Sequence, residues 1–364
     1  MCGIIGTIDW SENHPPDLEQ LRRMLGIIKH RGPDEFGLYI DHRAGIGCAR
    51  LSIVDLQTGQ QPIPNEDKSL WIVFNGEIYN HPELRVELEQ AGHLAQAFTF
   101  WAPLAPRTIF GNVRQLPPGH YLKIGNAHAT LSCYWRLTFP EDGGELPITL
   151  DSAADHLRFL LADATRLRLR ADVEVGSYLS GGIDSTYIAA LIRQRSPERL
   201  RTFSISFEEA AFDERAYQEI ATDFLQTEHR RVECRNVDIG RVFSDVVWHS
   251  EAPLLRTSPA PMYLLSRLVH ENDIKVVLTG EGADEFLGGY NIYKEDKIRR
   301  FWAQDPTSTM RPLLLRRLYP YVSDLARGGA YLEAFFRRGL LETDRAGYSH
   351  QIRWRNGDRM RRLF

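Results

Sequence analysis

The 364-residue sequence has few cysteines, and none of them forms a C-x-x-C pair. The four cysteines are scattered along the chain: Cys2, Cys48, Cys133 and Cys234. Such spacing argues against a zinc site or a disulfide framework. It suits a reducing compartment, so we expect a cytoplasmic protein.

Long apolar runs and a strong net charge are also missing. No stretch approaches the roughly 20 apolar residues of a membrane span, and Met1-Cys2-Gly3 leads into a strand-like segment without a secretory signal. The net charge of −4 gives the whole chain no attraction to nucleic acid or anionic membrane. We therefore expect neither as a partner.

Arginine pairs in the last part of the chain are the one feature that favours a nucleic-acid face. They are Arg299-Arg300, Arg316-Arg317, Arg337-Arg338 and Arg361-Arg362. Isolated arginine pairs are common on exposed helices. A solvated helical surface is therefore the preferred interpretation, and nucleic-acid binding is kept as an alternative.

The first part of the chain, residues 1–140, is rich in predicted strands. Apolar alternation and helical spacing predict strands at 3–9, 37–40, 44–47, 70–74 and 121–124, and helices at 18–28 and 82–89. The strand at 70–74 is expected to be buried. A linker with Pro140, Gly143, Gly144 and Pro147 then marks a domain boundary.

Strands and helices alternate in the second part, residues 150–364. The predicted strands are 173–179, 201–207, 229–234 and 274–279, and the predicted helices are 151–168, 184–195, 213–225, 238–249 and 260–271. This alternation is typical of a parallel sheet with helices on both faces. Ligands of such sheets bind at the carboxyl ends of the strands.

The two common nucleotide loops are absent, since there is neither a Gly-Lys-Ser/Thr ending nor a G-x-G-x-x-G sequence. Instead, Ser180-Gly181-Gly182-Ile183-Asp184-Ser185 joins a predicted strand to a predicted helix. The glycines let backbone N–H groups approach phosphate oxygens, and the helix N-terminus favours negative charge. We therefore predict an ATP site here, with an ordinary tight turn as the alternative.

A second glycine-rich segment, Gly280-Glu281-Gly282-Ala283-Asp284-Glu285, follows the apolar strand that ends at Thr279. Three acids in one turn repel one another unless a cation lies among them. Mg²⁺ carried by ATP is the natural candidate, with Asp184 and Asp284 as shared ligands. The alternative is a polar helix cap.

The start of the chain carries a different chemistry. Removal of Met1 would leave Cys2 with a thiol and a free α-amine that can act as its base. Arg50 provides a cation for a carboxylate, Asn75 and Gly76 could form an oxyanion hole, and Glu77 could bind an ammonium group. A chance small residue at position 2 and an Asn-Gly hairpin turn are the alternatives.

Together these motifs resemble the glutamine-hydrolysing asparagine synthetases over nearly the whole chain. The first domain carries Met1-Cys2-Gly3-Ile4, His30-Arg31-Gly32-Pro33-Asp34, Arg50 to Asp55 and Phe74 to Asn80, and the second carries Ser180 to Ser185, Ser204 to Phe207, Phe212-Asp213-Glu214 and Gly280 to Tyr290. The resemblance implies an αββα glutaminase domain of the N-terminal-nucleophile (Ntn) hydrolase type at 1–140. It implies an α/β nucleotide-binding domain of the adenine nucleotide α-hydrolase type at 150–364.

The resemblance also implies a mechanism. Cys2 would attack the side-chain amide of glutamine, which Arg50 and Glu77 hold, while Asn75 and Gly76 steady the oxyanion. The released ammonia would pass through a tunnel to the second site, where ATP and aspartate form β-aspartyl-AMP and pyrophosphate. Leu179, Ile205, Thr279 and Gly280 would border the nucleotide, and Glu281 would support formation of the adenylate.

Two departures from the family pattern set further expectations. The chain passes from Gly92 almost directly to Ala105, where the family has a longer stretch with an aspartate that helps to bind glutamine. We therefore predict that glutamine hydrolysis is impaired or absent. The chain also ends at Phe364, before a lysine that the family places near the phosphates, so the second domain is expected to be incomplete.

The leading hypothesis is an ATP-dependent ligase that forms asparagine from aspartate, with glutamine or ammonia as nitrogen donor. A ligase of secondary metabolism, a β-lactam-forming enzyme and a catalytically impaired ATP-binding remnant are the alternatives. The expected partners are glutamine, aspartate and ATP, and a homodimer is left open.

Overall fold

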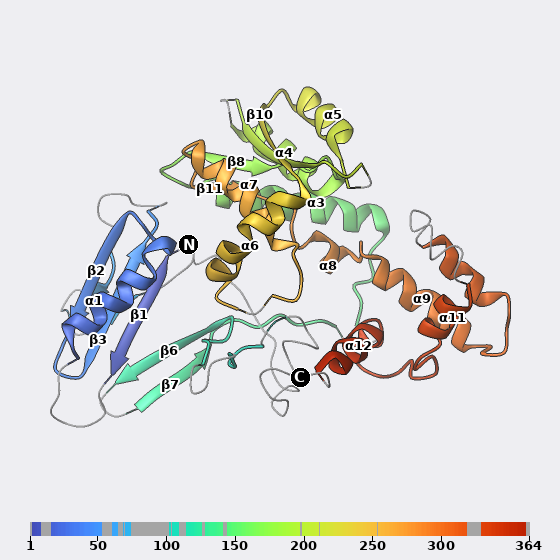
Figure 1. Cartoon of the computed structure of the whole chain (residues 1–364), viewed down its shortest axis with the longest axis horizontal. Coiled ribbons are helices and arrows are strands. Elements are labelled where there is room, and N and C mark those ends of the chain that lie inside the picture. Colours follow the sequence, from blue (N-terminus) through green and yellow to red (C-terminus); the bar gives the residue numbers. More distant parts are fainter. Residues whose placement is uncertain are drawn as a thin grey trace.

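The computed structural model places a β-rich N-terminal part, a parallel α/β domain and a helical C-terminal part in chain order (Figure 1). The structure describes residues 2–8, 16–52, 60–64, 68, 70–73, 102, 104–108, 114–125, 128–140, 144–196, 199–210, 212–252, 254–318 and 329–361. The expectations for Asn75, Gly76 and Glu77, and for a helix at 82–89, lie outside the described residues.

The N-terminal sheet is antiparallel, with the strand order β1-β3-β2. Its strands are β1 (Gly3–Ile8), β2 (Glu35–Ile40) and β3 (Ala44–Arg50), which contain the predicted hairpin. Helix α1 (Leu18–Ile27) begins where the Asp17 side chain accepts a hydrogen bond from the Glu19 N–H at 2.8 Å. Its buried face packs on β1 and β3 and forms the core of this part of the molecule.

Two small sheets complete the described N-terminal part. Strand β4 (Ile63–Pro64) pairs with β5 (Trp71–Ile72), and β6 (His120–Gly125) pairs with β7 (His128–Cys133). The strand expected at 70–74 is present as β5, but its expected burial is wrong for Leu70 and Ile72, which are 60% and 54% exposed. Phe74 lies outside the described residues. Among the described strands β5 pairs only with the two-residue β4, which leaves Ile72 open to water, whereas Trp71 stacks on Tyr39 with ring centroids 4.2 Å apart.

The second domain is built on a four-stranded parallel sheet with the order β10-β9-β8-β11. The strands are β8 (Val175–Tyr178), β9 (Arg201–Phe207), β10 (Glu228–Cys234) and β11 (Val276–Leu278), so all four predicted strands are confirmed. Strand β8 lies between β9 and β11, where the order of connections reverses. Such a switch point is where open α/β sheets bind ligands.

Helices cover both faces of this sheet (Figure 1). On one face α4 (Ile183–Arg195) and α5 (Arg215–Leu225) pack around the core residues Leu179 and Ile192, with α3 (Leu150–Arg168) beyond α4. On the other face α6 (Asn236–Ser250) and α7 (Pro259–Glu271) bury Cys234, Val242 and Leu264.

The C-terminal part consists of short helices that follow the sheet. They are α8 (Ala283–Leu287), α9 (Asn291–Ala303), the 3₁₀ helix η2 (Arg311–Arg317), α11 (Gly329–Phe336) and α12 (Gln351–Arg361). No helix within the described ranges is long and apolar enough to cross a membrane.

One arginine of this part does not lie on a solvated surface, contrary to expectation. Arg299 is 2% exposed and donates to the carbonyl oxygens of Phe336, Tyr348 and Arg338 at 3.2, 3.1 and 3.0 Å. Its guanidinium therefore satisfies carbonyl groups that the short helices leave unpaired. The neighbouring Arg300 is exposed and forms an ion pair with Asp296 at 2.8 Å.

Candidate functional site

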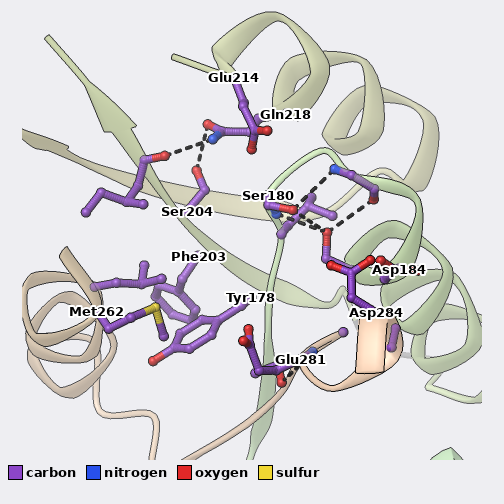
Figure 2. A pocket seen from close by; sticks show the side chains of 18 of the residues that line it. Tyr178, Ser180, Asp184, Phe203, Ser204, Glu214, Gln218, Met262, Glu281 and Asp284 are labelled. Carbon is purple, nitrogen blue, oxygen red and sulfur yellow. Dashed lines mark hydrogen bonds between the residues drawn. The ribbon is translucent and has the colours of Figure 1, made fainter. Parts of the chain in front are cut away.

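A cavity of about 290 Å³ lies at the carboxyl ends of β8, β9 and β11 (Figure 2). Its lining joins the two glycine-rich segments that the sequence singles out to an apolar wall. The lining residues are Tyr178, Leu179, Ser180, Gly182, Asp184, Ser185, Phe203, Ser204, Ile205, Phe207, Phe212, Glu214, Gln218, Met262, Leu265, Thr279, Gly280, Glu281, Gly282, Ala283, Asp284 and Tyr290.

The first segment is folded by its own serine hydroxyl groups. Ser185 Oγ accepts the Ser180 N–H at 3.1 Å and lies 2.9 Å from Ser180 Oγ, and Ser180 Oγ accepts the Gly182 N–H at 3.2 Å. Gly181 has a φ of 85°, and a Cβ there would lie 2.7 Å from the backbone of Tyr217 and Gln218. The turn is thus preformed at the N-terminus of α4, where the helix dipole favours an anion.

The second segment closes directly onto the first. A Cβ on Gly280 would lie 2.6 Å from the Ser185 nitrogen and 2.7 Å from the Asp184 carbonyl carbon. Only a glycine permits this approach. The Glu281 N–H donates to Thr279 Oγ1 at 3.3 Å, and both residues line the cavity.

The structure brings Asp184 and Asp284 together at one side of the cavity, as Figure 2 shows. Glu281 lines the same cavity, and Glu285 accepts the Tyr290 hydroxyl at 3.1 Å. Burial raises the pKa of Tyr290, and the hydrogen bond to Glu285 and the charges of Asp284 and Glu281 raise it further. The cavity therefore has an acidic side that attracts a cation.

The two aspartates fit a magnesium ion that is carried by phosphate. Among the described residues no group of three or more histidine, cysteine or acidic side chains could hold a metal by itself. Magnesium usually binds one or two carboxylates and takes its other ligands from phosphate oxygens and water. Asp184 and Asp284 meet that requirement beside the phosphate-type loop.

Most of the residues predicted for the nucleotide site line this one cavity. Leu179, Ile205 and Thr279 lie there with the polar residues of the two segments. Gly181 does not line it, because its backbone turns toward the start of α5.

The cavity also has an apolar wall, which the sequence did not predict. Tyr178, Phe212 and Met262 come from a strand end, a loop and α7, and they line the cavity with apolar surface. Phe203 of β9 is fully buried in the core cluster against which Tyr178 packs. No local pattern in the sequence joins these residues, because they come from separate elements.

A largely buried hydrogen-bond network reaches the cavity through Ser204 and Gln218. Ser204 Oγ donates to Gln218 Oε1 at 2.9 Å and lies 2.9 Å from His229 Nε2, while Thr202 Oγ1 lies 3.0 Å from His229 Nδ1. Gln218 Nε2 donates to the Ile205 carbonyl at 2.9 Å. Burial, with a contribution from Arg231, lowers the pKa of His229 to about 4, so the ring is neutral at pH 7.

The Cys2 region lies in the N-terminal domain. The Leu51 N–H donates to Cys2 Sγ at 3.4 Å. Burial and the neighbouring Cys2 raise the pKa of Cys48 to about 11, so that Cys48 remains a neutral thiol. Arg50 is 6% exposed, and its Nη1 donates to Glu35 Oε2 at 2.8 Å. Of the residues predicted for glutamine, only Arg50 lies within the described residues.

Comparison with known families places these two regions in context. A family model described as asparagine synthase matches residues 156–364, more than half of the chain. The chain belongs to the asparagine synthase family. A second model, described as a glutamine amidotransferase domain, matches residues 1–99, the part that contains Cys2 and Arg50.

Individual members of the family are similar at low identity. The chain is 28% identical to glutamine-hydrolysing asparagine synthetase 1 of Bacillus subtilis, over 86% of this chain and 63% of that protein. It is 27% identical to the amidase chyE of Penicillium rubens, over 77% of this chain and 56% of that protein. It is 27% identical to asparagine synthetase B of Escherichia coli, over 92% of this chain and 72% of that protein. The first two matches span less than two thirds of those relatives.

Proposed function

We propose that this member of the asparagine synthase family is an ATP-dependent amide-forming ligase. It would activate the side-chain carboxylate of aspartate as β-aspartyl-AMP, release pyrophosphate, and transfer ammonia to give asparagine. The observation that carries the proposal is the meeting of the Ser180–Ser185 and Gly280–Asp284 segments in one cavity. An anion-binding turn beside an acidic pair is suited to a magnesium-bound triphosphate.

Different residues of the cavity would bind the phosphates and the base of the nucleotide. Ser180, Gly182 and Ser185 would hold phosphate oxygens, and the wall that contains Tyr178 and Met262 would face the base. A magnesium ion on Asp184 and Asp284 would neutralise charge on the leaving pyrophosphate.

Glu281 lies in the cavity with these residues and would support formation of the adenylate. The activated acyl group and ammonia would then form the amide bond, with AMP as the leaving group.

Glutamine, the proposed nitrogen donor, would be hydrolysed in the N-terminal domain. Cys2 would act as the nucleophile toward glutamine, with Arg50 and Glu77 as partners of the amino-acid end and Asn75 and Gly76 as oxyanion donors. The match to a glutamine amidotransferase domain supports this assignment. Free ammonia is the alternative donor, since it needs no glutaminase chemistry.

A product assay tests the proposal. The purified chain is incubated with Mg-ATP and aspartate, with glutamine in one reaction and ammonium in another, and AMP, pyrophosphate and asparagine are measured. Equal amounts of the three products with ammonium would support the proposal. ATP binding without any AMP or pyrophosphate would instead indicate the catalytically impaired remnant.

A second candidate differs only in the acceptor acid. Two relatives, chyE and the amidase chry2 of Gibberella zeae, are named amidases, and the latter is 26% identical over 92% of this chain. An amide-forming ligase with another carboxylic acid is therefore a reasonable alternative. A panel of amino acids and small carboxylic acids in the same assay separates the two. We also propose a cytoplasmic location and a homodimer for this protein.

A further inference from the structure

Among the described residues, a lysine and an arginine form ion pairs from one domain to the other, and His30 Nε2 also lies 3.7 Å from Glu251 Oε1. Asp34 Oδ2 lies 2.6 Å from Lys275 Nζ, and Arg31 Nη1 lies 2.6 Å from Glu251 Oε2. Asp34 and Arg31 come from the segment just before β2, whereas Lys275 directly precedes β11 and Glu251 follows α6. The two pairs thus cross the same boundary at different places.

Within the described ranges, the Asp34–Lys275 pair continues toward the Cys2 region through hydrogen bonds. The same Asp34 Oδ2 accepts the Ser52 N–H at 2.9 Å, and the Asp34 N–H donates to the Arg50 carbonyl at 3.1 Å. The residue between them, Leu51, donates its N–H to Cys2 Sγ at 3.4 Å, and its carbonyl oxygen accepts the Cys2 thiol with a longer separation of 3.7 Å. Asp34 therefore forms hydrogen bonds with the backbone of Arg50 and Ser52, on both sides of Leu51.

The charge of Asp34 suits this role. Burial acts to raise its pKa, but hydrogen bonds from Lys275 and Ser52 and the charges of Lys275 and Arg50 outweigh burial, so the pKa lies below its usual value. The carboxylate is ionised at neutral pH and can accept both hydrogen bonds at once. Lys275 and Asp34 are 37% and 27% exposed, so water weakens the pair without removing it.

We infer that Lys275 of the parallel-sheet domain acts through Asp34 as a positioning residue that fixes the Leu51 N–H against the Cys2 sulfur. This inference rests on the proposed role of Cys2 as a nucleophile. A hydrogen-bond donor aimed at a sulfur stabilises the thiolate, which is the reactive form. The glutaminase nucleophile would then depend on a cation supplied by the other domain.

The test measures the alkylation of Cys2 by iodoacetamide as a function of pH, read from the Cys2 peptide by mass spectrometry. The exposed Cys133 serves as an internal reference in the same sample. The midpoint of the Cys2 rate profile reports the stability of the thiolate separately from its accessibility. Neither ATP nor glutamine turnover is needed.

Four variants are compared with the unmodified chain. In Lys275→Met and in Asp34→Ala the Leu51 N–H loses its fixed position, and the midpoint should rise by a few tenths of a pH unit to about one unit. Lys275→Arg keeps the cation and should leave the midpoint unchanged. Glu251→Gln breaks the other ion pair and should also leave it unchanged.

The direction of the shifts separates positioning from simple charge effects. If the charges acted only through space, loss of Lys275 would raise the midpoint and loss of Asp34 would lower it. Positioning requires that both substitutions raise it, and that the double variant shifts no more than Asp34→Ala alone. Shifts of opposite sign, no shift in Lys275→Met, or an equal shift in Glu251→Gln would overturn the inference.

Failure of the proposed function can be told apart from failure of this inference. A chain that makes neither AMP nor asparagine can still show the two matching shifts, which leaves the positioning role intact. Normal products with unshifted midpoints give the reverse outcome. Lys275→Met changes a partly exposed side chain, so the absence of a shift in this variant overturns the inference even where Asp34→Ala disturbs folding.

Discussion

At the scale of single residues, glycines decide how closely the two segments of the nucleotide cavity approach. Gly280 leaves no room for a Cβ against the start of α4, and Gly181 combines a positive φ with a close contact to α5. Both requirements come from the backbone rather than from a ligand. The shape of the site therefore depends on two glycines, which have no side chain that could bind a ligand.

Gly181→Ala should destabilise the protein by about 1–3 kcal/mol, because alanine is strained at that φ and its Cβ meets backbone atoms of α5. Gly240→Ala is the matched control. A Cβ at this position inside α6 would have no heavy atom within 4 Å, so the substitution should stabilise the helix by about 0.5–1 kcal/mol. Urea unfolding measures both, and equal effects of the two substitutions would contradict the account.

At the scale of elements, strand β9 serves the cavity with both of its faces. Phe203 and Ile205 point toward α7 and belong to its apolar clusters, whereas Thr202 and Ser204 point toward β10 and α5 and belong to the hydrogen-bond network with His229. Because this network is buried, its polar groups must remain paired. A proton on His229 would disturb it.

Folding stability should therefore fall as the pH is lowered through the range between 6.5 and about 4. Because the pKa of His229 is about 4 in the folded protein, against 6.5 for a free histidine, the unfolded chain binds a proton in this range and the folded chain does not. Arg231, which lowers this pKa, and Glu219, which opposes it, face the ring. His229→Gln should show a shallower loss between pH 6.5 and 4 in thermal unfolding, and an unchanged slope would count against the network.

The elements of the parallel domain could be predicted from the sequence, but the buried polar contacts could not. Apolar runs and short turns located β8 to β11 and α3 to α7 because a sheet covered on both faces leaves a strong pattern. The pairing of Ser204 with Gln218 and His229 depends on residues far apart in the chain, and no local pattern encodes it. The burial of Arg299 was missed for the same reason, since its carbonyl partners lie 37 or more positions away.

The candidate site shows the same division. The acidic pair, Asp184 and Asp284, was predicted to share a cation because both segments follow parallel strands, whose carboxyl ends meet at one edge. The apolar wall was not predicted, because Tyr178 and Met262 approach the cavity from different elements. The hydrogen bonds that position the backbone near Cys2 could not be predicted either, because Lys275 and Asp34 are 241 positions apart in the sequence.

At the scale of the whole molecule, the two proposed chemistries lie in separate domains, which ion pairs on Asp34 and Glu251 connect. The shortened sequence between Gly92 and Ala105 affects the first domain alone. We therefore expect glutamine to be a poor nitrogen donor and ammonium to be an effective one. Cys2→Ala should leave ammonium-dependent product formation unchanged. Robust glutamine hydrolysis that disappears in Cys2→Ala would refute the prediction of an impaired glutaminase.

The central claim is that two glycine-rich segments form one adenylating site. Aspartate-dependent exchange of labelled pyrophosphate into ATP tests it most directly, because the exchange needs adenylate formation but no nitrogen donor. Exchange should require magnesium and aspartate, and Asp184→Asn and Asp284→Asn should each reduce it by at least about 100-fold, whereas the exposed Asp223→Asn on α5 should not. No exchange in the unmodified chain, or undiminished exchange in Asp284→Asn, would contradict the account.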